Sequence, residues 1–348
     1  MAASNAAPTD TLPPIGEQAA TLLGHAAGYV GHRTVGMGLR SGLIAALADE
    51  PGLSSDELAA RTNHDPFYTG VWCQGALASG LCERDDDGYR LTPHMDTLLL
   101  DQDAPGYVGG LFPLFERDEL FDRFEQVLPT GERRWWNDYG PDWIDGVARS
   151  GRPFYTRLIP EGLGQVPGLR EALAMGGRIV DTGCGTGQGL VRLAAHHPAS
   201  PIVGVDGDAR SITSARKHVE AAGLADRVEL VESPLESFTL DQPAALIINN
   251  ISMHECRDID RATRRIHDAL EPGGWFVISD FPFPDTDDGL ATLAGRIMAG
   301  IQFFEAQIDD QLLPRSAYDD LLARHGFVDL GYAELTPVHH LTWGRRAA

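Results

Sequence analysis

The chain has 348 residues, with 28 Lys or Arg and 50 Asp or Glu, so its formal net charge at pH 7 is −22. This length allows two domains, each with its own hydrophobic core. A surface this acidic repels phosphate groups, so we expect neither nucleic acid nor an anionic membrane as a partner. The sequence also has no apolar run long enough to span a bilayer.

The N-terminus and the cysteines both favour a cytoplasmic location. Residues 1–18 have neither the basic segment nor the apolar segment of a secretory signal, and we predict that residues 1–20 form a disordered lead-in. The four cysteines show no CxxC spacing and no zinc pattern with histidine, so free thiols in a reducing compartment are the simplest interpretation.

Residues 21–104 are predicted to form a small helical domain. This stretch shows the apolar spacing of helices, an N-cap serine at Ser54 or Ser55 with acids in the following turn, and then a β-hairpin that turns at Asp87-Gly88. Three helices followed by a hairpin are typical of a winged-helix domain. The three predicted helices lie within residues 38–50, 52–62 and 65–83.

The third predicted helix decides between DNA and protein as the partner of this domain. Between Asn63 and Glu83 it carries no Lys or Arg, whereas a helix that reads DNA needs cations to meet the phosphates. It offers the aromatic side chains of Phe67, Tyr68 and Trp72 instead. We therefore expect this domain to hold a homodimer together.

Residues 105–170 are rich in aromatic side chains and are predicted to form a helical connector that also caps the substrate. The cluster of Trp135, Trp136, Tyr139 and Trp143 lies among polar, Gly and Pro residues and has no helical periodicity. A loop of that kind over an active site can form a pocket wall. Packing between the two domains is the alternative interpretation of these aromatic residues.

Residues 171–348 alternate between apolar, β-rich runs and helical segments. This alternation is typical of a parallel sheet with helices on both faces. The last two runs lie close enough in sequence to form an antiparallel pair at the edge of the sheet. Strands are predicted within residues 178–183, 201–206, 227–233, 245–250, 275–281, 327–336 and 339–345.

The strongest motif is a glycine loop between a strand and a helix. The strand ends in Asp181, and Gly183, Gly185 and Gly187 follow with the spacing GxGxG. Glycine lets a ligand lie against the backbone where a Cβ would block it. No register gives GxGxxG and no Gly-Lys-Ser/Thr is present, which excludes the NAD fingerprint and the P-loop. Asp206 ends the next strand and can accept two hydrogen bonds from a ribose diol, so the motif predicts an adenosine-containing ligand.

The segments VDTGCGTG, GVD, VELVES and LIINN, in this order and spacing, resemble the class I S-adenosylmethionine-dependent methyltransferases. With residues 21–104, the whole chain is similar to the small-molecule methyltransferases of plants and bacteria that carry a winged-helix dimerisation domain. The resemblance implies an α/β fold: a Rossmann-like seven-stranded methyltransferase sheet with an antiparallel last strand, preceded by the α-helical winged-helix domain. It also implies S-adenosylmethionine as the cofactor and a small-molecule acceptor, and no metal ion is predicted.

The resemblance assigns contacts to that cofactor. Asp181, Gly183 and Gly185 would border the methionine and the ribose, and Asp206 would hold the ribose hydroxyls. Family members often have Gly-Asp where this chain has Ser-Pro, so the carboxylate that would contact the adenine amine is missing. The remaining implied contacts are Ser233, Pro234 and Leu235 beside the adenine and Asn249 beside the methionine end.

Two residues are predicted to be catalytic. His254 follows the fourth strand of this domain, where the plant-type O-methyltransferases have a His-Asp pair, and the resemblance implies that it is the general base. A histidine suits that role because its ordinary pKa lies near neutrality. Glu305 lies in an apolar setting, within an insertion that covers the substrate in related enzymes, so it is a candidate orienting or basic carboxylate.

These residues predict an enzyme of secondary metabolism that methylates a hydroxyl of an aromatic or natural-product acceptor. Three alternatives stay open, one of which is a methyltransferase fold put to non-methylating work such as decarboxylation. Some bacterial relatives that methylate the carbon next to a 2-oxo acid hold an iron ion with residues in these two places, and His254 with Glu305 and Glu255 could make such a metal-assisted C-methyltransferase site. A winged-helix regulator that senses S-adenosylmethionine without catalysis is the remaining alternative.

Overall fold

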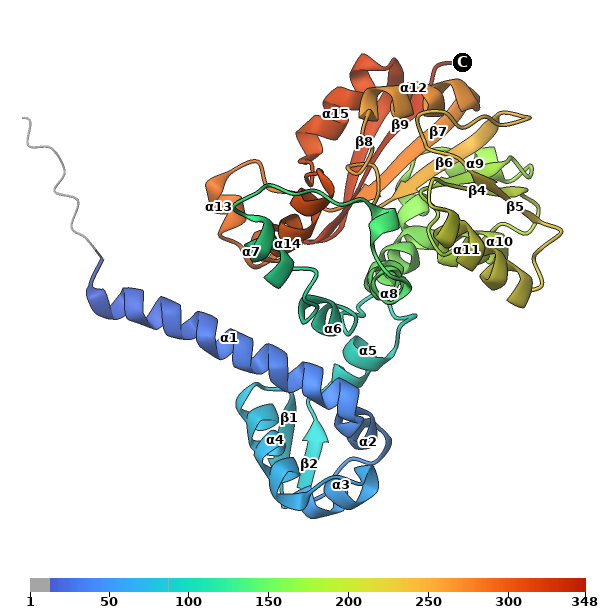
Figure 1. Ribbon diagram of the computed structural model, residues 1–348. Helices are drawn as coiled ribbons and strands as arrows, with labels where there is room; N and C mark the ends of the chain where they lie inside the picture. The colour runs from blue at the N-terminus through green and yellow to red at the C-terminus, as the bar shows by residue number, and fades with distance from the viewer. Residues whose placement is uncertain (1–12, 87) are drawn as a thin grey trace, which may run out of the picture. The chain divides into compact units, whose positions relative to one another are not determined.

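The computed structural model describes residues 13–86 and 88–348 (Figure 1). The chain divides into two compact units, Met1–Leu100 and Asp101–Ala348, so the predicted connector belongs to the second unit. The predicted lead-in lies mostly outside the described residues, but a long helix begins at Ile15. The last residues of the lead-in are therefore helical, contrary to the prediction. This helix buries few side chains, so it lacks the apolar periodicity that would have revealed it.

The N-terminal unit has the predicted order of helices followed by a hairpin. Its elements are α1 (Ile15–Ser41), α2 (Leu43–Asp49), α3 (Ser55–Thr62), α4 (Pro66–Ala78), β1 (Cys82–Asp85), β2 (Gly88–Leu91) and α5 (Met95–Leu100). Ser54 caps α3: its Oγ accepts a hydrogen bond from Glu57 N (3.3 Å), and its backbone N–H donates to the Glu57 carboxylate (2.8 Å). The hairpin joins β1 and β2, although its predicted turn residue Asp87 lies outside the described residues.

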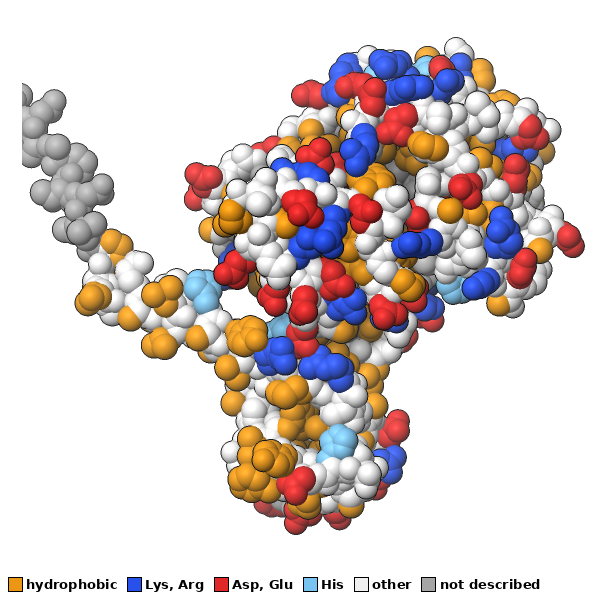
Figure 2. Space-filling model, viewed as in Figure 1, with side chains coloured by type: hydrophobic (Ala, Val, Ile, Leu, Met, Phe, Trp, Pro, Cys, Tyr) orange, Lys and Arg blue, Asp and Glu red, His pale blue; other side chains and the backbone are white. Residues whose placement is uncertain are grey.

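Apolar side chains are exposed along α1 and on α4 (Figure 2). On α4, Phe67 is 74% exposed and Tyr68 is 73% exposed. Trp72 does not belong to this surface, because it is buried and its Nε1 donates to the backbone oxygen of Thr34 in α1 (3.0 Å). The interpretation of Trp72 as a docking residue is therefore wrong. Exposed apolar residues of α1 include Leu22, Leu23, Tyr29 and Val30.

The C-terminal unit is built around a sheet that has seven strands among the described residues (Figure 1). The strands are β3 (Ile179–Thr182), β4 (Ile202–Asp206), β5 (Val228–Glu232), β6 (Ala244–Asn250), β7 (Leu270–Asp280), β8 (Phe327–Thr336) and β9 (His339–Arg346). They take the order β5-β4-β3-β6-β7-β9-β8, and β9 runs antiparallel to both of its neighbours. The predicted strands and the antiparallel last strand are confirmed.

Helices cover both faces of this sheet because successive strand residues point to opposite sides. Ile179 of β3 packs on the face covered by α10 and α11, whereas Val180 packs on the face covered by α12 and α15. No helix in the described residues is both long and apolar enough to cross a membrane. The helices that follow β3 are α10 (Gln188–His196), α11 (Ala209–Ala221), α12 (Ile259–Ala269), α13 (Asp287–Leu290), α14 (Leu293–Glu305) and α15 (Arg315–Arg324).

The segment before the sheet packs against α14. Tyr139 and Trp143 are buried, with ring centroids 5.4 and 4.7 Å from that of Phe304. These two aromatic residues therefore belong to a core within the C-terminal unit, and this contact does not test the predicted packing between the two domains. The elements of the segment are α6 (Leu111–Phe115), α7 (Asp122–Val127), η1 (Trp136–Asp138), α8 (Pro141–Arg157), η2 (Leu158–Gly162), η3 (Leu163–Gln165) and α9 (Leu169–Leu173), and a further turn η4 (Ala306–Ile308) follows α14.

The centre of the sheet is a topological switch point. β3 and β6 are neighbours, but the chain continues from β3 to β4 and β5 on one side and from β6 to β7 on the other. Connections that diverge in this way leave a crevice at the carboxyl ends of the strands, where α/β folds bind ligands. The glycine loop follows β3 and His254 follows β6, so both predicted motifs lie at this crevice.

Candidate active site

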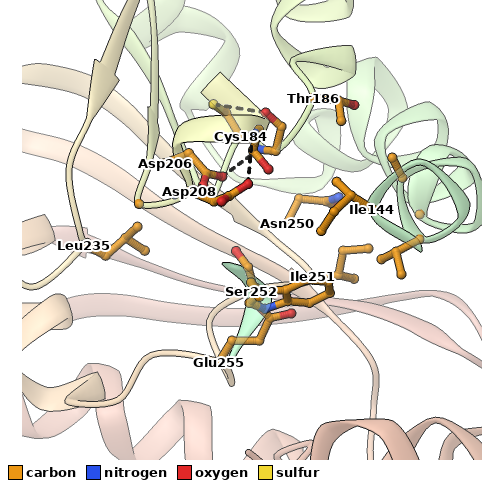
Figure 3. Close-up of a pocket in the computed structure, with 18 of the residues that line it drawn as sticks. Ile144, Cys184, Thr186, Asp206, Asp208, Leu235, Asn250, Ile251, Ser252 and Glu255 are labelled. Carbon is orange, nitrogen blue, oxygen red and sulfur yellow. Dashed lines mark hydrogen bonds between the residues drawn. The ribbon is translucent and has the colours of Figure 1, made fainter. Parts of the chain in front are cut away.

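A cavity of about 450 Å³ opens at the carboxyl ends of β3, β4 and β6 (Figure 3). The glycine loop and Asp206 line one part of it, and residues 250–252 and 255–257 line another. The wall is completed by Trp135 just before η1, by Trp136 of η1, and by Ile144 and Val147 of α8. The cavity therefore joins the predicted nucleotide motif to an aromatic surface.

The glycine loop has a backbone that other residues would strain. Gly183 has φ +72°, and a Cβ there would lie 2.1 Å from the Ser252 hydroxyl oxygen. Gly185 has φ +51° and nothing within 4 Å of its Cβ position, so open space meets the backbone at this point. The loop thus offers bare backbone to a ligand, as the motif predicted.

Asp206 holds the glycine loop and still has capacity for a ligand. One carboxylate oxygen accepts a hydrogen bond from Gly185 N (2.8 Å), and the other accepts one from Asp208 N (2.9 Å). Burial raises the pKa of Asp206 to about 6, although these two hydrogen bonds oppose the shift. Each oxygen keeps a free lone pair. The carboxylate can therefore accept hydrogen bonds from two hydroxyls of a ribose.

Asp181 is fully buried and does not line the cavity. Its Oδ2 accepts a hydrogen bond from the hydroxyl of Tyr155 (2.9 Å), which does line the cavity, whereas its Oδ1 has no partner among the described residues. Burial raises the pKa of Asp181 to about 8. A buried carboxyl with an unpaired oxygen beside a ligand cavity suits a cationic group of that ligand.

The β5 end of the cavity differs from the implied adenine site in two ways. Pro234 and Leu235 line it as predicted, but Ser233 does not, and the Ser233 hydroxyl donates to Pro234 O (3.1 Å). Glu236 also lines the cavity, and sequence reasoning missed it. A carboxylate is thus present two residues after Pro234, although not at the position where the family often has Asp.

The two consecutive asparagines at the end of β6 have different environments. Asn249 is fully buried; its Nδ2 donates to Thr182 O (3.0 Å), and its Oδ1 accepts from the Ser252 hydroxyl (3.2 Å). These bonds join β6 to the glycine-loop strand, so Asn249 shapes the site without lining the cavity. Asn250 lines the cavity instead, and sequence reasoning missed it.

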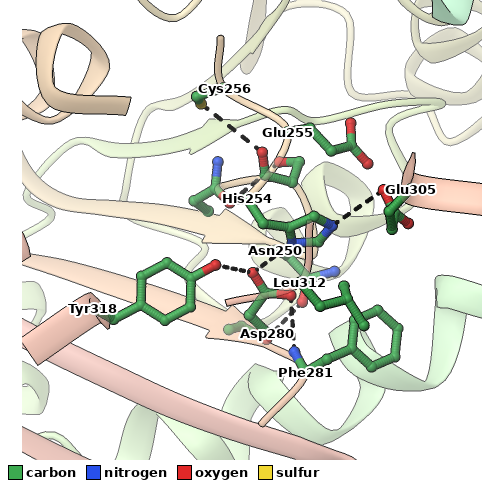
Figure 4. A network of polar contacts seen from close by, with 12 residues as sticks. Asn250, His254, Glu255, Cys256, Asp280, Phe281, Glu305, Leu312 and Tyr318 are labelled. Atoms are coloured by element: carbon green, nitrogen blue, oxygen red, sulfur yellow. Dashed lines mark hydrogen bonds and ion pairs between the residues drawn. The ribbon is translucent and has the colours of Figure 1, made fainter. Parts of the chain in front are cut away.

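His254 is held in a buried network behind the cavity (Figure 4). Its Nδ1 lies 2.8 Å from Asp280 Oδ2, which also accepts a hydrogen bond from the Tyr318 hydroxyl (2.5 Å). Burial acts to raise the pKa of Asp280, but the imidazolium and these hydrogen bonds outweigh it and lower the pKa. Asp280 therefore orients the ring and stabilises its charged form. Neither Asp280 nor Tyr318 was predicted.

Two further carboxylates face the same imidazole. His254 Nε2 lies 3.7 Å from Glu305 Oε2, an atom that has no hydrogen-bond partner among the described residues. Glu255 lines the cavity, and its Oε2 accepts a hydrogen bond from Trp136 Nε1 (2.7 Å). The structure thus brings the two predicted catalytic residues, His254 and Glu305, together. Neither lines the cavity, whereas Glu255 beside them does.

The charges of this cluster determine which group can accept a proton. Burial disfavours the imidazolium, but the neighbouring carboxylates, above all Asp280, outweigh it and raise the pKa of His254 to about 10. Burial raises the pKa of Glu305 to about 7. Burial and the nearby Glu305 raise the pKa of Glu255 well above its ordinary value. At neutral pH His254 therefore carries a proton, and Glu305 titrates.

The same cluster has the composition of a metal site. One nitrogen of His254 and one carboxylate oxygen each of Glu255 and Glu305 lie within 4.8 Å of one another. One imidazole and two carboxylates suit a divalent transition metal. These three residues are the set that the sequence suggested for a metal-assisted reaction.

The aromatic part of the cavity suits a planar ligand. Trp135 and Trp136 both line it, together with the apolar side chains of Ile144 and Val147. The guanidinium of Arg257 lies over the Trp135 ring, 4.0 Å from its centroid, and so covers one face of that indole. The aromatic cluster predicted from the sequence is thus divided, because these two tryptophans form a pocket wall while Tyr139 and Trp143 form core.

Comparisons with known proteins identify relatives of the sheet domain. Residues 179–274 match a family described as a methyltransferase domain. The chain is 31% identical over 189 residues to the trans-aconitate 2-methyltransferase of Variovorax paradoxus (strain S110), covering 52% of this chain and 68% of that protein. The match to the enzyme of the same name from Delftia acidovorans covers 61% of that protein. The chain thus spans about two thirds or less of the length of these relatives.

Solved structures share the fold over nearly the whole chain. Human N-acetylserotonin methyltransferase, solved in complex with S-adenosylmethionine, has a TM-score of 0.68 at 16% identity, covering 98% of this chain and all (100%) of that chain. An O-methyltransferase family protein from Burkholderia thailandensis has a TM-score of 0.69 at 16% identity, covering 97% of this chain and 99% of that chain. Both architectures therefore include a counterpart of the N-terminal unit.

Proposed function

We propose that this chain, which belongs to the class I S-adenosylmethionine-dependent methyltransferases, transfers a methyl group to a hydroxyl of a small planar acceptor. The observation that carries the proposal is the cavity that joins the glycine loop and Asp206 to Trp136 and Glu255. A nucleotide and a planar acceptor can lie end to end in it, which aligns the two reacting groups. The aromatic wall favours an aromatic natural product, and hence secondary metabolism.

The residues of the glycine-loop end fit S-adenosylmethionine. Asp206 would accept hydrogen bonds from the ribose hydroxyls, and Gly183 and Gly185 would let the ribose and methionine approach the backbone. Asp181, held by Tyr155, would ionise to meet the ammonium group of the methionine. When bound, the cofactor supplies an electrophilic methyl group on its sulfonium sulfur.

The proton of the acceptor hydroxyl would leave through the buried cluster. Glu255 lines the cavity. Its carboxylate lies within 4.8 Å of the His254 ring and of Glu305, which is close enough for one water molecule to bridge them. The His254–Glu305 pair holds one proton at neutral pH and can take up a second, because the pKa of Glu305 is raised only to about 7. We therefore propose that His254 and Glu305 act as a general-base pair: Glu305 takes up the proton, and the imidazolium of His254 lowers the pKa of Glu305 enough for it to be ionised.

Mass spectrometry of reaction products tests this function. The full chain would be incubated with S-adenosylmethionine carrying a deuterated methyl group and with a panel of phenols and hydroxylated heterocycles. We expect a deuterated methyl ether of at least one panel member, formed together with S-adenosylhomocysteine. Formation of no labelled product from any member would contradict the proposal, and a label on carbon would favour the second candidate.

The second candidate is metal-assisted methylation of an enolisable carbon next to a 2-oxo acid. The approach of His254, Glu255 and Glu305 to within 4.8 Å favours it. A metal there would stabilise the enolate oxygen as a Lewis acid. We expect dialysis against a chelator to leave hydroxyl methylation unchanged, because the cluster can take the proton by itself. Loss of activity on dialysis, restored by added ferrous iron, would show that the second candidate is correct.

We also propose that a second copy of this chain covers the exposed apolar residues of α1. Leu23 is 69% exposed and Val30 is 59% exposed, and α4 has no Lys or Arg that would favour DNA. Light scattering should report a dimer for the wild type and a monomer for Leu23→Glu/Val30→Glu, because burying two carboxylates in an apolar interface is costly. Gln18→Glu adds a charge to the same helix outside this apolar pair and should remain dimeric. A double variant that is still dimeric would refute the interface.

A cytoplasmic location is part of the proposal. All four cysteines, Cys73, Cys82, Cys184 and Cys256, are free thiols, and three of them are buried. Buried free thiols are compatible with a reducing compartment.

A further inference from the structure

A chain of hydrogen bonds that the proposed function does not use leads from α8 to the cavity wall. Arg157 Nε donates to His339 Nδ1 (2.9 Å), and His339 Nε2 lies 2.7 Å from the Ser279 hydroxyl. The Ser279 hydroxyl in turn lies 2.7 Å from Asn250 Oδ1. Arg157 itself is anchored by Pro105 O, which accepts from its NH1 (2.8 Å). Asn250, His339 and Ser279 are at most 2% exposed.

The direction of every bond in this chain is fixed by its first member. Arginine can only donate, so His339 Nδ1 must accept and the ring proton must be on Nε2. His339 Nε2 then donates to Ser279, whose hydroxyl proton is left to donate to Asn250 Oδ1. If the Asn250 amide were reversed, the Ser279 hydroxyl would face an NH₂ group and lose its acceptor. Burial and Arg157 also hold the pKa of His339 well below its ordinary value, so the neutral ring persists at neutral pH.

The last member of the chain therefore presents donors to the cavity. Asn250 lines the cavity, and its Nδ2 is buried without a hydrogen-bond partner among the described residues (Figure 3). A buried amide nitrogen without a partner is costly, so a ligand that supplies an acceptor there is favoured over one that does not. Ammonium or alkyl groups at this position would leave the donor unsatisfied.

We propose that Asn250 is a specificity-determining residue that selects methyl acceptors carrying a carbonyl or carboxylate oxygen in addition to the hydroxyl that is methylated. Ser279, His339 and Arg157 are positioning residues, because they fix which end of the Asn250 amide faces the ligand. This inference rests on the proposed function and narrows its acceptors to hydroxylated aromatic ketones, acids and related carbonyl compounds. Glu255, five residues further along the same cavity wall, meets the hydroxyl that donates its proton.

Two pairs of phenols that differ only in the carbonyl oxygen test the inference. The probes are meta-hydroxyacetophenone against meta-ethylphenol and the corresponding para pair, titrated into the full chain saturated with S-adenosylhomocysteine. Both members of each pair are neutral, so the acidic cluster does not bias the comparison. We expect the wild type to bind the ketone of at least one pair roughly ten- to hundredfold more tightly. We expect Asn250→Leu to abolish that preference and Asn250→Asp, which removes the donors, to abolish it as well.

The positioning residues have a readout of their own. Nitrogen NMR of the full chain should show His339 as the Nε2–H tautomer, and the signal should change in Arg157→Leu. Ser279→Ala should lower the preference for the ketone without changing the affinity for S-adenosylhomocysteine. Without the Ser279 hydroxyl, the Asn250 amide can also adopt the reversed orientation. An Nδ1–H tautomer of His339 would contradict the donor and acceptor roles assigned along these hydrogen bonds and would overturn the inference.

The remaining outcomes separate this inference from the proposed function. Equal affinity of the wild type for both members of each pair, or no binding of any probe, would overturn the inference. A loss of affinity for S-adenosylhomocysteine in Asn250→Leu, with the ketone preference kept, would overturn it too, because the donor would then serve the cofactor. A ketone preference without methyl transfer to any acceptor would support the inference while refuting the proposed function.

Discussion

Replacing His254 with Ala is expected to lower the turnover of the methyl acceptor by roughly two to four orders of magnitude, the usual effect of losing a positioned base. Without the imidazolium, burial and the nearby Asp310 and Asp280 act on Glu305 unopposed, so its pKa rises further and it stays protonated at neutral pH. The cluster then has no site for the proton of the acceptor. Steady-state kinetics on the acceptor found by mass spectrometry would measure the loss.

His254→Asn is the matched control for this experiment. In His254→Ala, Asp280 is left buried without its charged partner, which destabilises the fold. A loss of turnover in that variant alone would therefore not separate catalysis from folding. The amide of Asn can still donate to Asp280, whereas it has no counterpart of Nε2. We expect both variants to bind S-adenosylhomocysteine as the wild type does and both to lose turnover. Near-normal turnover in either variant would remove His254 from the reaction.

The pH profile should show which protonation state is active. The His254–Glu305 pair must be able to accept the proton of the methyl acceptor. The active form of the enzyme therefore has Glu305 ionised. Because the pKa of Glu305 is raised to about 7, kcat should fall as the pH drops through that region and should level off above it. Glu305→Gln cannot take the proton, so its rate should be low at every pH. An unchanged acid limb in this variant would assign the titration to another group.

Asp206→Ala is expected to weaken the binding of S-adenosylhomocysteine by roughly 2–4 kcal/mol, since it removes two hydrogen bonds to a charged acceptor. The carboxylate also accepts from Gly185 N, so its loss frees the glycine loop as well. Calorimetry would measure the affinity. Asp226→Ala makes the same change at an exposed residue of this domain and should bind normally. Equal affinities of Asp206→Ala and the wild type would exclude Asp206 from the site.

The strands, the glycine loop and Asp206 could be predicted because their signals are local. Short apolar runs alternate with helical segments, and the spacing of Gly183 and Gly185 reflects backbone angles that only glycine adopts easily. The position of His254 after β6 could be predicted for the same reason. These features depend on a few neighbouring residues and on the order of the elements.

The partners of these residues could not be predicted, because they are distant in sequence. Asp280 reaches His254 from β7, and Tyr318 of α15 donates a hydrogen bond to Asp280. Arg157 and His339 meet only once α8 has packed beside β9. Such pairings depend on how the elements pack and leave no pattern in the sequence.

The choice between Asn249 and Asn250 illustrates a limit of another kind. Consecutive residues of a strand point to opposite faces, so only one of two adjacent asparagines can line a cavity at that strand end. Which of them does so depends on the register of β6 against β3, where Asn249 pairs with Thr182. A shift of one residue would exchange their environments. The sequence gives both residues the same identity and therefore no basis for the choice.

A crystal structure of the full chain with S-adenosylhomocysteine tests the central claim most directly. It should show the ribose hydroxyls within hydrogen-bond distance of Asp206, with the sulfur facing the space bordered by Trp136, Asn250 and Glu255. A ligand whose sulfur points away from Glu255, or one bound outside the glycine loop, would contradict the account.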